Sequence, residues 1–236
     1  MKLFAAIKKP LLVLLLTAPA FGAMAQQTKQ FAVRNFNQIR VSSGIDLYLT
    51  QGTTENIKVT TDAALMDKIS VTKEGSQLVI AYKNNNNWNF TRKGSSIKAY
   101  VTVNQLNALA ASGGSDVYGN NTIKTDQLDI RSSGGADVRL TLAANNITIH
   151  SSGGSDVYLK GRATNLEIQA SGGSDVHALE FEVQNAKVSS SGGADVDVYV
   201  NRALEATSSG GSDIKYKGNA ALKNNSSKSG SVRKVN

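Results

Sequence analysis

The residues best suited to chemistry are six aspartates that recur in the C-terminal half of the chain. Each follows Ser-Gly-Gly-[Ser/Ala] and precedes valine or isoleucine, with gaps of 21, 19, 19, 20 and 18 residues: Asp116, Asp137, Asp156, Asp175, Asp195 and Asp213. A carboxylate can bind a hard cation such as Ca²⁺, or it can accept N–H groups of a tight turn. The repeat therefore predicts either a row of cation sites or a row of hydrogen-bonded corners.

The corner interpretation is favoured over the Ca²⁺ interpretation. Carboxylates stacked about 5 Å apart would repel each other by roughly 3 kcal/mol at an effective dielectric constant of 20, so something must offset the repulsion. Hydrogen bonds from corner N–H groups or serine hydroxyls can do so. A row of Ca²⁺ ions is the alternative, but one aspartate per repeat falls short of the six to eight oxygens that Ca²⁺ takes. We therefore expect no cofactor, with Ca²⁺ as the one candidate.

Aromatic residues outside the core pattern are the candidates for ligand contact. Trp88, the only tryptophan, and Phe90 lie in an asparagine-rich insertion, Lys83 to Lys93. Trp88 could stack on a sugar ring; the favoured alternative is that both rings fold back over the adjoining strands. The outward positions two residues after each motif aspartate differ between repeats and include Tyr118 and Tyr158. These four aromatic residues are the predicted ligand contacts.

Catalytic constellations are weak in this sequence. The irregular polar clusters are Asp195 with Asp197, and His177 beside Asp156 and Asp175. Neither makes a recognisable acid–base pair, and no catalytic triad, phosphate-binding loop or zinc-ligand spacing occurs. A carbohydrate-active enzyme of the β-helix type, a lyase or a hydrolase, remains the alternative. The expectation is a protein that is not an enzyme and has no catalytic residues.

Strands must position these residues, because apolar residues alternate with polar ones around every motif aspartate. The residue after the aspartate is always Val or Ile, and the residue seven before it is always apolar. Each repeat thus reads as a strand, a Ser-Gly-Gly corner, a second strand and a variable return. A unit this short cannot bury its apolar side alone, whereas stacked units share one core. The predicted fold is all-β: a right-handed parallel β-helix with about 19 residues per coil and an N-terminal capping β-layer.

The chain divides into a leader and a single β-helix domain. Residues 1–25 have a basic start, a short apolar run and Ala23-Met24-Ala25, which together predict a signal peptide cleaved before Gln26. In the domain, 26–236, residues 26–110 are the predicted capping and irregular coils. Residues 111–217 are the regular coils, and 218–236 are a polar C-terminal cap in which Ser229-Gly230-Ser231-Val232 is a worn copy of the motif.

Composition limits the partners and the compartment. The chain has no cysteine, which excludes disulfides and lipid attachment at the cleavage point. Its net charge of +8 includes three lysines of the leader, so the excess is mild and nucleic acid is not an expected partner. The leader's apolar run is too short for a transmembrane anchor. We expect an exported protein that is periplasmic, outer-membrane-associated or secreted, and an end-to-end homodimer is left open.

Three short segments precede the Ser-Gly-Gly-Ser-Asp-Val repeats: Phe36-Asn37-Gln38-Ile39, Val41-Ser42-Ser43-Gly44-Ile45-Asp46 and Thr50-Gln51-Gly52. Together with the repeats, they resemble the auto-transporter adhesin head GIN domain family. The resemblance covers roughly residues 31–217. It implies a right-handed β-helix of an exported protein, typical of Bacteroidota, and brings no catalytic residues. The expected function is a non-catalytic, adhesin-like or scaffolding module that binds a cell-envelope or surface component, with a glycan as one candidate ligand.

Overall fold

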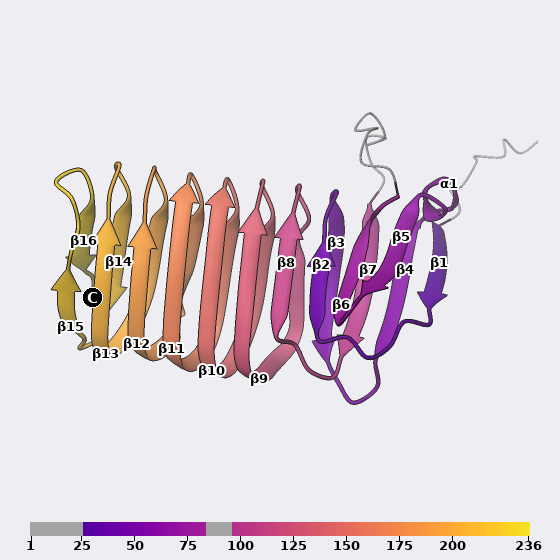
Figure 1. Ribbon diagram of the computed structural model, residues 1–236, viewed down its shortest axis with the longest axis horizontal. Helices are drawn as coiled ribbons and strands as arrows, with labels where there is room; N and C mark the ends of the chain where they lie inside the picture. Colours follow the sequence, from indigo (N-terminus) through magenta and orange to yellow (C-terminus); the bar gives the residue numbers. More distant parts are fainter. Residues whose placement is uncertain (1–25, 84–95) are drawn as a thin grey trace, which may run out of the picture.

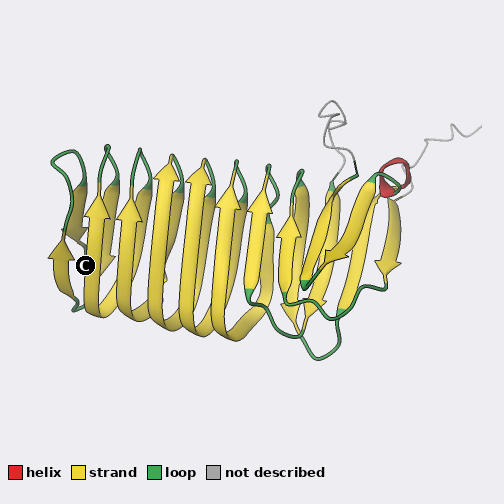
Figure 2. Ribbon diagram, viewed as in Figure 1, coloured by secondary structure: helices red, strands yellow, loops and turns green. Residues whose placement is uncertain are grey.

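The computed structural model describes residues 26–83 and 96–236 and shows a parallel β-solenoid of about seven turns, with about 19 residues per coil (Figure 1). The all-β, β-helical fold class predicted from the sequence is confirmed. Strands make up most of the described residues, and the one short helix among them lies at the N-terminal end (Figure 2). The predicted signal peptide, Trp88 and Phe90 lie outside the described residues. No helix within the described ranges is long and apolar enough to cross a membrane.

Five long strands form the regular coils. They are β9 (Val117–Ser133), β10 (Asp137–Gly153), β11 (Asp156–Gly172), β12 (Asp175–Ser190) and β13 (Asp195–Ser208). Neighbours pair in parallel, and the motif aspartates from Asp137 to Asp213 lie opposite one another. Each strand bends at the return between its two halves, so the halves lie in two facing layers (Figure 1). The loops along one edge in Figure 2 are the Ser-Gly-Gly corners.

The core runs along the solenoid between the two layers, as the period-two pattern predicts. The Val or Ile that follows each motif aspartate is fully buried, in the column Val117, Val138, Val157, Val176, Val196 and Ile214. Leu128, Ile147 and Leu166 line the facing layer and are almost fully buried. This continuous apolar filling is what makes the stack of small units stable.

The N-terminal part combines a cap with coils whose order in space differs from their order in the chain. Strands β2 (Gln38–Val41) and β3 (Ile45–Gln51) form one coil, which lies between the coil of β6 (Gln77–Tyr82) with β7 (Ile97–Val103) and the coil that begins with β8 (Ala108–Ser112). Parallel stacking therefore starts well before residue 111. The antiparallel elements cover the end: β1 (Gln26–Phe31), β4 (Asn56–Asp62) and β5 (Ile69–Glu74). Helix α1 (Ala63–Met66) buries Leu65 and Met66 there.

The C-terminal end is a last, short coil made by β14 (Asp213–Lys217), β15 (Ala221–Asn224) and β16 (Ser231–Lys234). Ser231 lies opposite Asp213 and Val232 opposite Ile214, so the worn copy of the motif stays in register. Nothing in the described chain stacks beyond β15 and β16, which pair on one side only.

Candidate functional site

The motif aspartates form a column along the corner edge, here called the Asp column, which Asp46 extends at the N-terminal end. Asp116 accepts the backbone N–H of Asp137 at 3.3 Å; Asp175 accepts that of Asp195, and Asp195 that of Asp213, both at 3.2 Å. Buried serines close the corners from inside, as where Ser190 donates to the carbonyl of Ala194 at 2.6 Å. Hydrogen bonding thus offsets carboxylate repulsion at these rungs without a cation.

We predict that neither Ca²⁺ nor EDTA changes the thermal unfolding midpoint, because every motif carboxylate already accepts a hydrogen bond. Three accept a backbone N–H, and the other three accept a side-chain donor, from Arg139, Tyr158 and Ser231. No group of three or more His, Asp or Glu side chains in the described ranges is placed to hold a metal ion. Differential scanning calorimetry with EDTA and with added CaCl₂ measures the effect. A midpoint that rises with Ca²⁺, and does so less in Asp156→Asn, would instead establish the row of cations.

Asp46, at the N-terminal end of the Asp column, has a carboxyl whose pKa is raised. Burial raises the pKa of its carboxyl, Asp116 raises it further, and Lys98 on the neighbouring strand lowers it. Because the pKa of the Asp46 carboxyl is higher in the folded protein than in the unfolded chain, its protonated form favours folding. This contribution to stability is complete below pH 3.8, the ordinary pKa, and is lost as the pH rises through the folded-state pKa.

Asp46→Asn is therefore expected to unfold at a higher temperature than the parent at pH 7 and at the same temperature at pH 3. The gain is at most about 1 kcal/mol, because the carboxyl is largely solvent-screened. Urea unfolding at both pH values measures it, with the exposed Asp67→Asn as the control. A gain that persists at pH 3 would show that the effect is not the charge of Asp46.

Two residues beyond the Asp column, the outward side chains form a second column, here called the aromatic column. Strand register places its members in consecutive coils, in the order Tyr100, Tyr48, Tyr118, Arg139, Tyr158 and His177. The ring of Tyr48 stacks between Tyr100 and Tyr118, with centroids 5.0 and 5.3 Å apart. Tyr158 stacks on His177 at 4.6 Å. The predicted contacts Tyr118 and Tyr158 thus belong to one continuous array.

Arg139 joins the two groups of rings. Its guanidinium lies 5.7 Å from the Tyr118 ring centroid and 4.7 Å from that of Tyr158, and it donates to Asp137 at 2.8 Å. The Tyr118 and Tyr158 hydroxyls donate to Asp116 and Asp156, at 3.1 and 3.4 Å. The ring faces are therefore covered by neighbours, and what remains for a ligand is ring edges, hydroxyls and the guanidinium.

The array continues into charged residues towards the C-terminus. His177 Nδ1 lies 3.7 Å from Asp197, and Lys215 Nζ lies 3.9 Å from the same carboxylate. Asp195, the other half of that predicted cluster, accepts an N–H in the Asp column instead. His177 stacks on Tyr158 and faces Asp197, and among the described residues no hydrogen bond or ion pair joins it to Asp156 or Asp175.

Sequence reasoning missed four members of the aromatic column. Tyr48 could have been found, because it stands two residues after Asp46 in the one-glycine copy of the motif. Arg139 and His177 occupy the same position in their repeats, but only the structure shows that they stack with tyrosines. Tyr100 follows no motif, and its place beside Tyr48 depends on the out-of-order coils.

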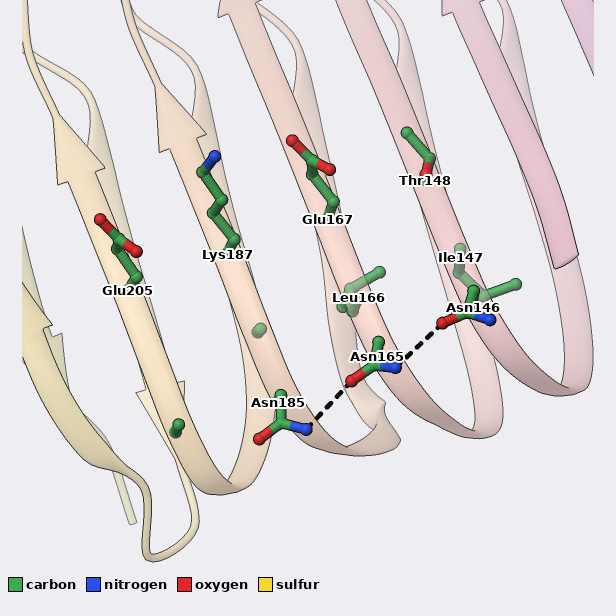
Figure 3. Close-up of a pocket in the computed structure, with 11 residues that line it drawn as sticks. Asn146, Ile147, Thr148, Asn165, Leu166, Glu167, Asn185, Lys187 and Glu205 are labelled. Carbon is green, nitrogen blue, oxygen red and sulfur yellow. Dashed lines mark hydrogen bonds between the residues drawn. The ribbon is translucent and has the colours of Figure 1, made fainter.

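The opposite layer carries a shallow depression of about 390 Å³, lined by both polar and apolar side chains (Figure 3). Asn165 donates to Asn146 at 2.9 Å and Asn185 donates to Asn165 at 3.0 Å, so the three amides form a hydrogen-bonded row across three coils. Glu167, Lys187 and Glu205 stand beside this row in consecutive coils. The amides bond to one another from coil to coil, which marks this row first as a support of the return.

Comparisons with known proteins place these features in a family. The sequence profile described as "Putative auto-transporter adhesin, head GIN domain" matches residues 35–220. The chain belongs to this family. Comparison with curated proteins gives no match.

Solved structures share the fold. A "putative adhesin" from Bacteroides fragilis matches with a TM-score of 0.81 and 24% identity, over 90% of this chain and 98% of that one. A "putative adhesin" from Parabacteroides distasonis gives 0.71 and 22%, over 91% and 98%. A "putative lipid binding protein" from the same species gives 0.68 and 17%, over 89% and 97%. At these identities the likeness concerns the fold alone.

Proposed function

We propose that this protein is an exported, non-catalytic, adhesin-like module that binds a component of the cell envelope or cell surface through its aromatic column. The observation that carries the proposal is the stacked array of four tyrosines, one arginine and one histidine across six consecutive coils. Membership in a family described by adhesion supports the same role. Tyrosine and arginine are also the residue types that dominate binding hot spots.

Preorganisation is the physical reason why this array suits binding. Each ring is fixed by its neighbours and two hydroxyls are fixed by carboxylates, so little side-chain entropy remains to be lost when a ligand docks. Tyr100, at the N-terminal end of the array, is 41% exposed, which is unusual for a large aromatic residue. The array therefore presents a rigid, partly apolar strip beside the acidic strip of the Asp column.

The ligand that fits this strip is extended and rich in hydroxyl groups. Contact groups recur once per coil, at the strand spacing of about 4.8 Å, so a linear polymer lying across the coils would meet equivalent groups repeatedly. Ring edges give apolar contact, while carboxylates and tyrosine hydroxyls accept hydrogen bonds from the ligand. A glycan of the envelope has this chemistry, and a sugar-stacking Trp88 would add to it.

The proposal is tested by binding and by fractionation. The chain beginning at Gln26 is applied to a glycan array and to isolated cell envelopes, and the full chain is located in fractionated cells. We expect the full chain to be exported and the chain beginning at Gln26 to be retained on one glycan class. We also expect the ligand to be chemically unchanged after incubation. Retention on neither probe, a cytoplasmic location, or shortened glycan chains after incubation would overturn the proposal.

A further inference from the structure

The C-terminal coil differs in charge from the rest of the domain. Residues 26–212 contain 17 Lys and Arg against 17 Asp and Glu, whereas the last coil, residues 213–236, contains six Lys and Arg against one acid, Asp213. The six are Lys215, Lys217, Lys223, Lys228, Arg233 and Lys234. Sequence position alone would make this a solvated tail. The structure instead folds the segment into the last rung, so the cations occupy one end of the solenoid (Figure 1).

The cations surround that end and do not lie on one face. Arg233 lies opposite Lys215 in one layer, and Lys223 belongs to β15 in the other layer. Lys228 is in the loop between β15 and β16. Lys215 and Lys223 are near carboxylates, and Lys217 lies over the Tyr199 ring. Lys228, Arg233 and Lys234 are exposed. A surface that meets the solenoid end-on would contact all three.

An apolar residue is exposed at the same end. Leu222 lies opposite Leu204, which is 1% exposed, yet Leu222 is 40% exposed, in a strand, β15, that pairs with β13 on one side only. Besides Tyr100, it is the one large hydrophobic residue that is strongly exposed in the described parts of the chain. Cations around an exposed apolar residue are the composition of surfaces that dock on anionic membranes.

We propose that the C-terminal coil docks end-on to an anionic lipid surface, with Lys228, Arg233 and Lys234 meeting headgroup phosphates and Leu222 entering the interface. A second copy of this chain fits the end less well, because two such ends placed together would bring the six cations of one copy against the six cations of the other. A soluble polyanion would leave Leu222 in water. Docking in this way would hold the solenoid axis away from the membrane and leave the aromatic column free along its length. The inference does not depend on which ligand that column binds.

Vesicle co-sedimentation tests the proposal with the chain that begins at Gln26. Binding is expected to phosphatidylglycerol-containing vesicles and not to pure phosphatidylcholine vesicles, and to weaken as salt is raised. The triple variant Lys228→Gln, Arg233→Gln, Lys234→Gln should lose about a hundredfold in vesicle affinity, given the contribution of each cation near an anionic surface. The control, Lys73→Gln, Lys124→Gln, Arg162→Gln, changes the charge equally on the body and should stay within about threefold of the parent.

Leu222→Ser separates the apolar contribution and should lower vesicle affinity several-fold. Thermal unfolding of each variant shows that the coil still forms. Equal binding to both vesicle types, no binding to either, or an equal loss in the body control would overturn the proposal. Binding to dextran sulfate without vesicle binding would point to a soluble polyanion. If the parent chain forms a dimer without vesicles, and Leu222→Ser abolishes that dimer, a second copy covers the end. Either result would overturn lipid docking.

Discussion

Replacing Gly161 by alanine is expected to destabilise the solenoid by about 3–5 kcal/mol, which corresponds to a fall of roughly 10 °C in the unfolding midpoint. Gly161 has a φ of +107° in the return of β11. A Cβ atom there would lie 2.1 Å from the carbonyl oxygen of Leu142 in the preceding coil. The backbone of one strand would have to move away from the other in the middle of the stack.

The energetic cost has two parts. A side chain at this φ costs about 1–3 kcal/mol in backbone strain, and the displaced strands weaken ladder hydrogen bonds on both sides. Because each coil contacts only its neighbours, the disturbance falls on the interfaces between β10, β11 and β12. Circular dichroism during heating and during urea titration measures the loss.

Gly154→Ala is the matched control for this prediction. Gly154 lies in a Ser-Gly-Gly corner, its φ is not positive, and a Cβ there would meet nothing within 4 Å. Its midpoint should stay close to the parent value or rise slightly, because alanine restricts the unfolded chain. Equal losses in Gly154→Ala and Gly161→Ala would show that glycine entropy, and not the close approach of two strands, sets the effect.

The regular coils were predictable from the sequence because one physical pattern repeats in them. Alternation around each aspartate specifies which side chains face inward, and Gly-Gly specifies the corner, so register follows from aligning the copies. Val157 and Ile214 are buried as that alignment requires. The returns were less visible: residues 160–163 pair with their neighbours as continuous strand, although their polar composition is that of a loop.

The order of the N-terminal coils could not be predicted. Alternating strands at residues 38–49 and 78–103 are visible in the sequence, but either could have stacked next to β9. The backbone N–H of Gly44 donates to the carbonyl of Gly113 at 3.0 Å, which joins the one-glycine coil to the regular stack. Consequently the later segment, 77–103, lies further out. This reversal brings Tyr100 next to Tyr48 and lengthens the aromatic column beyond its predicted members.

Binding is expected to depend on the tyrosines on either side of Arg139 in that column. Replacing both Tyr118 and Tyr158 by threonine is expected to lower retention on isolated cell envelopes at least thirtyfold, the loss typical of removing a binding hot spot. The two changes remove the rings on either side of Arg139, so the guanidinium loses both cation–π partners as well. Threonine suits an outward strand position, so the coils themselves should persist.

Two controls separate binding from folding. Tyr199→Thr removes an outward tyrosine that lies over Lys217 outside the aromatic column, and should leave retention unchanged. The double variant Tyr118→Phe, Tyr158→Phe keeps the stacked rings while removing the hydroxyls bound to Asp116 and Asp156. Full retention by the phenylalanine variant would assign the contact to ring edges, whereas loss in both variants would assign it to the hydroxyls.

One combination of results would contradict binding by the aromatic column. If the threonine variant is retained like the parent while its unfolding midpoint falls, the stacked rings stabilise the coils and do not bind. The binding face would then have to be sought in the amide row of the opposite layer, where Asn165 can be replaced by Ala. Retention lost in Asn165→Ala but kept in the threonine variant would move the adhesin-like contact from one layer of the solenoid to the other.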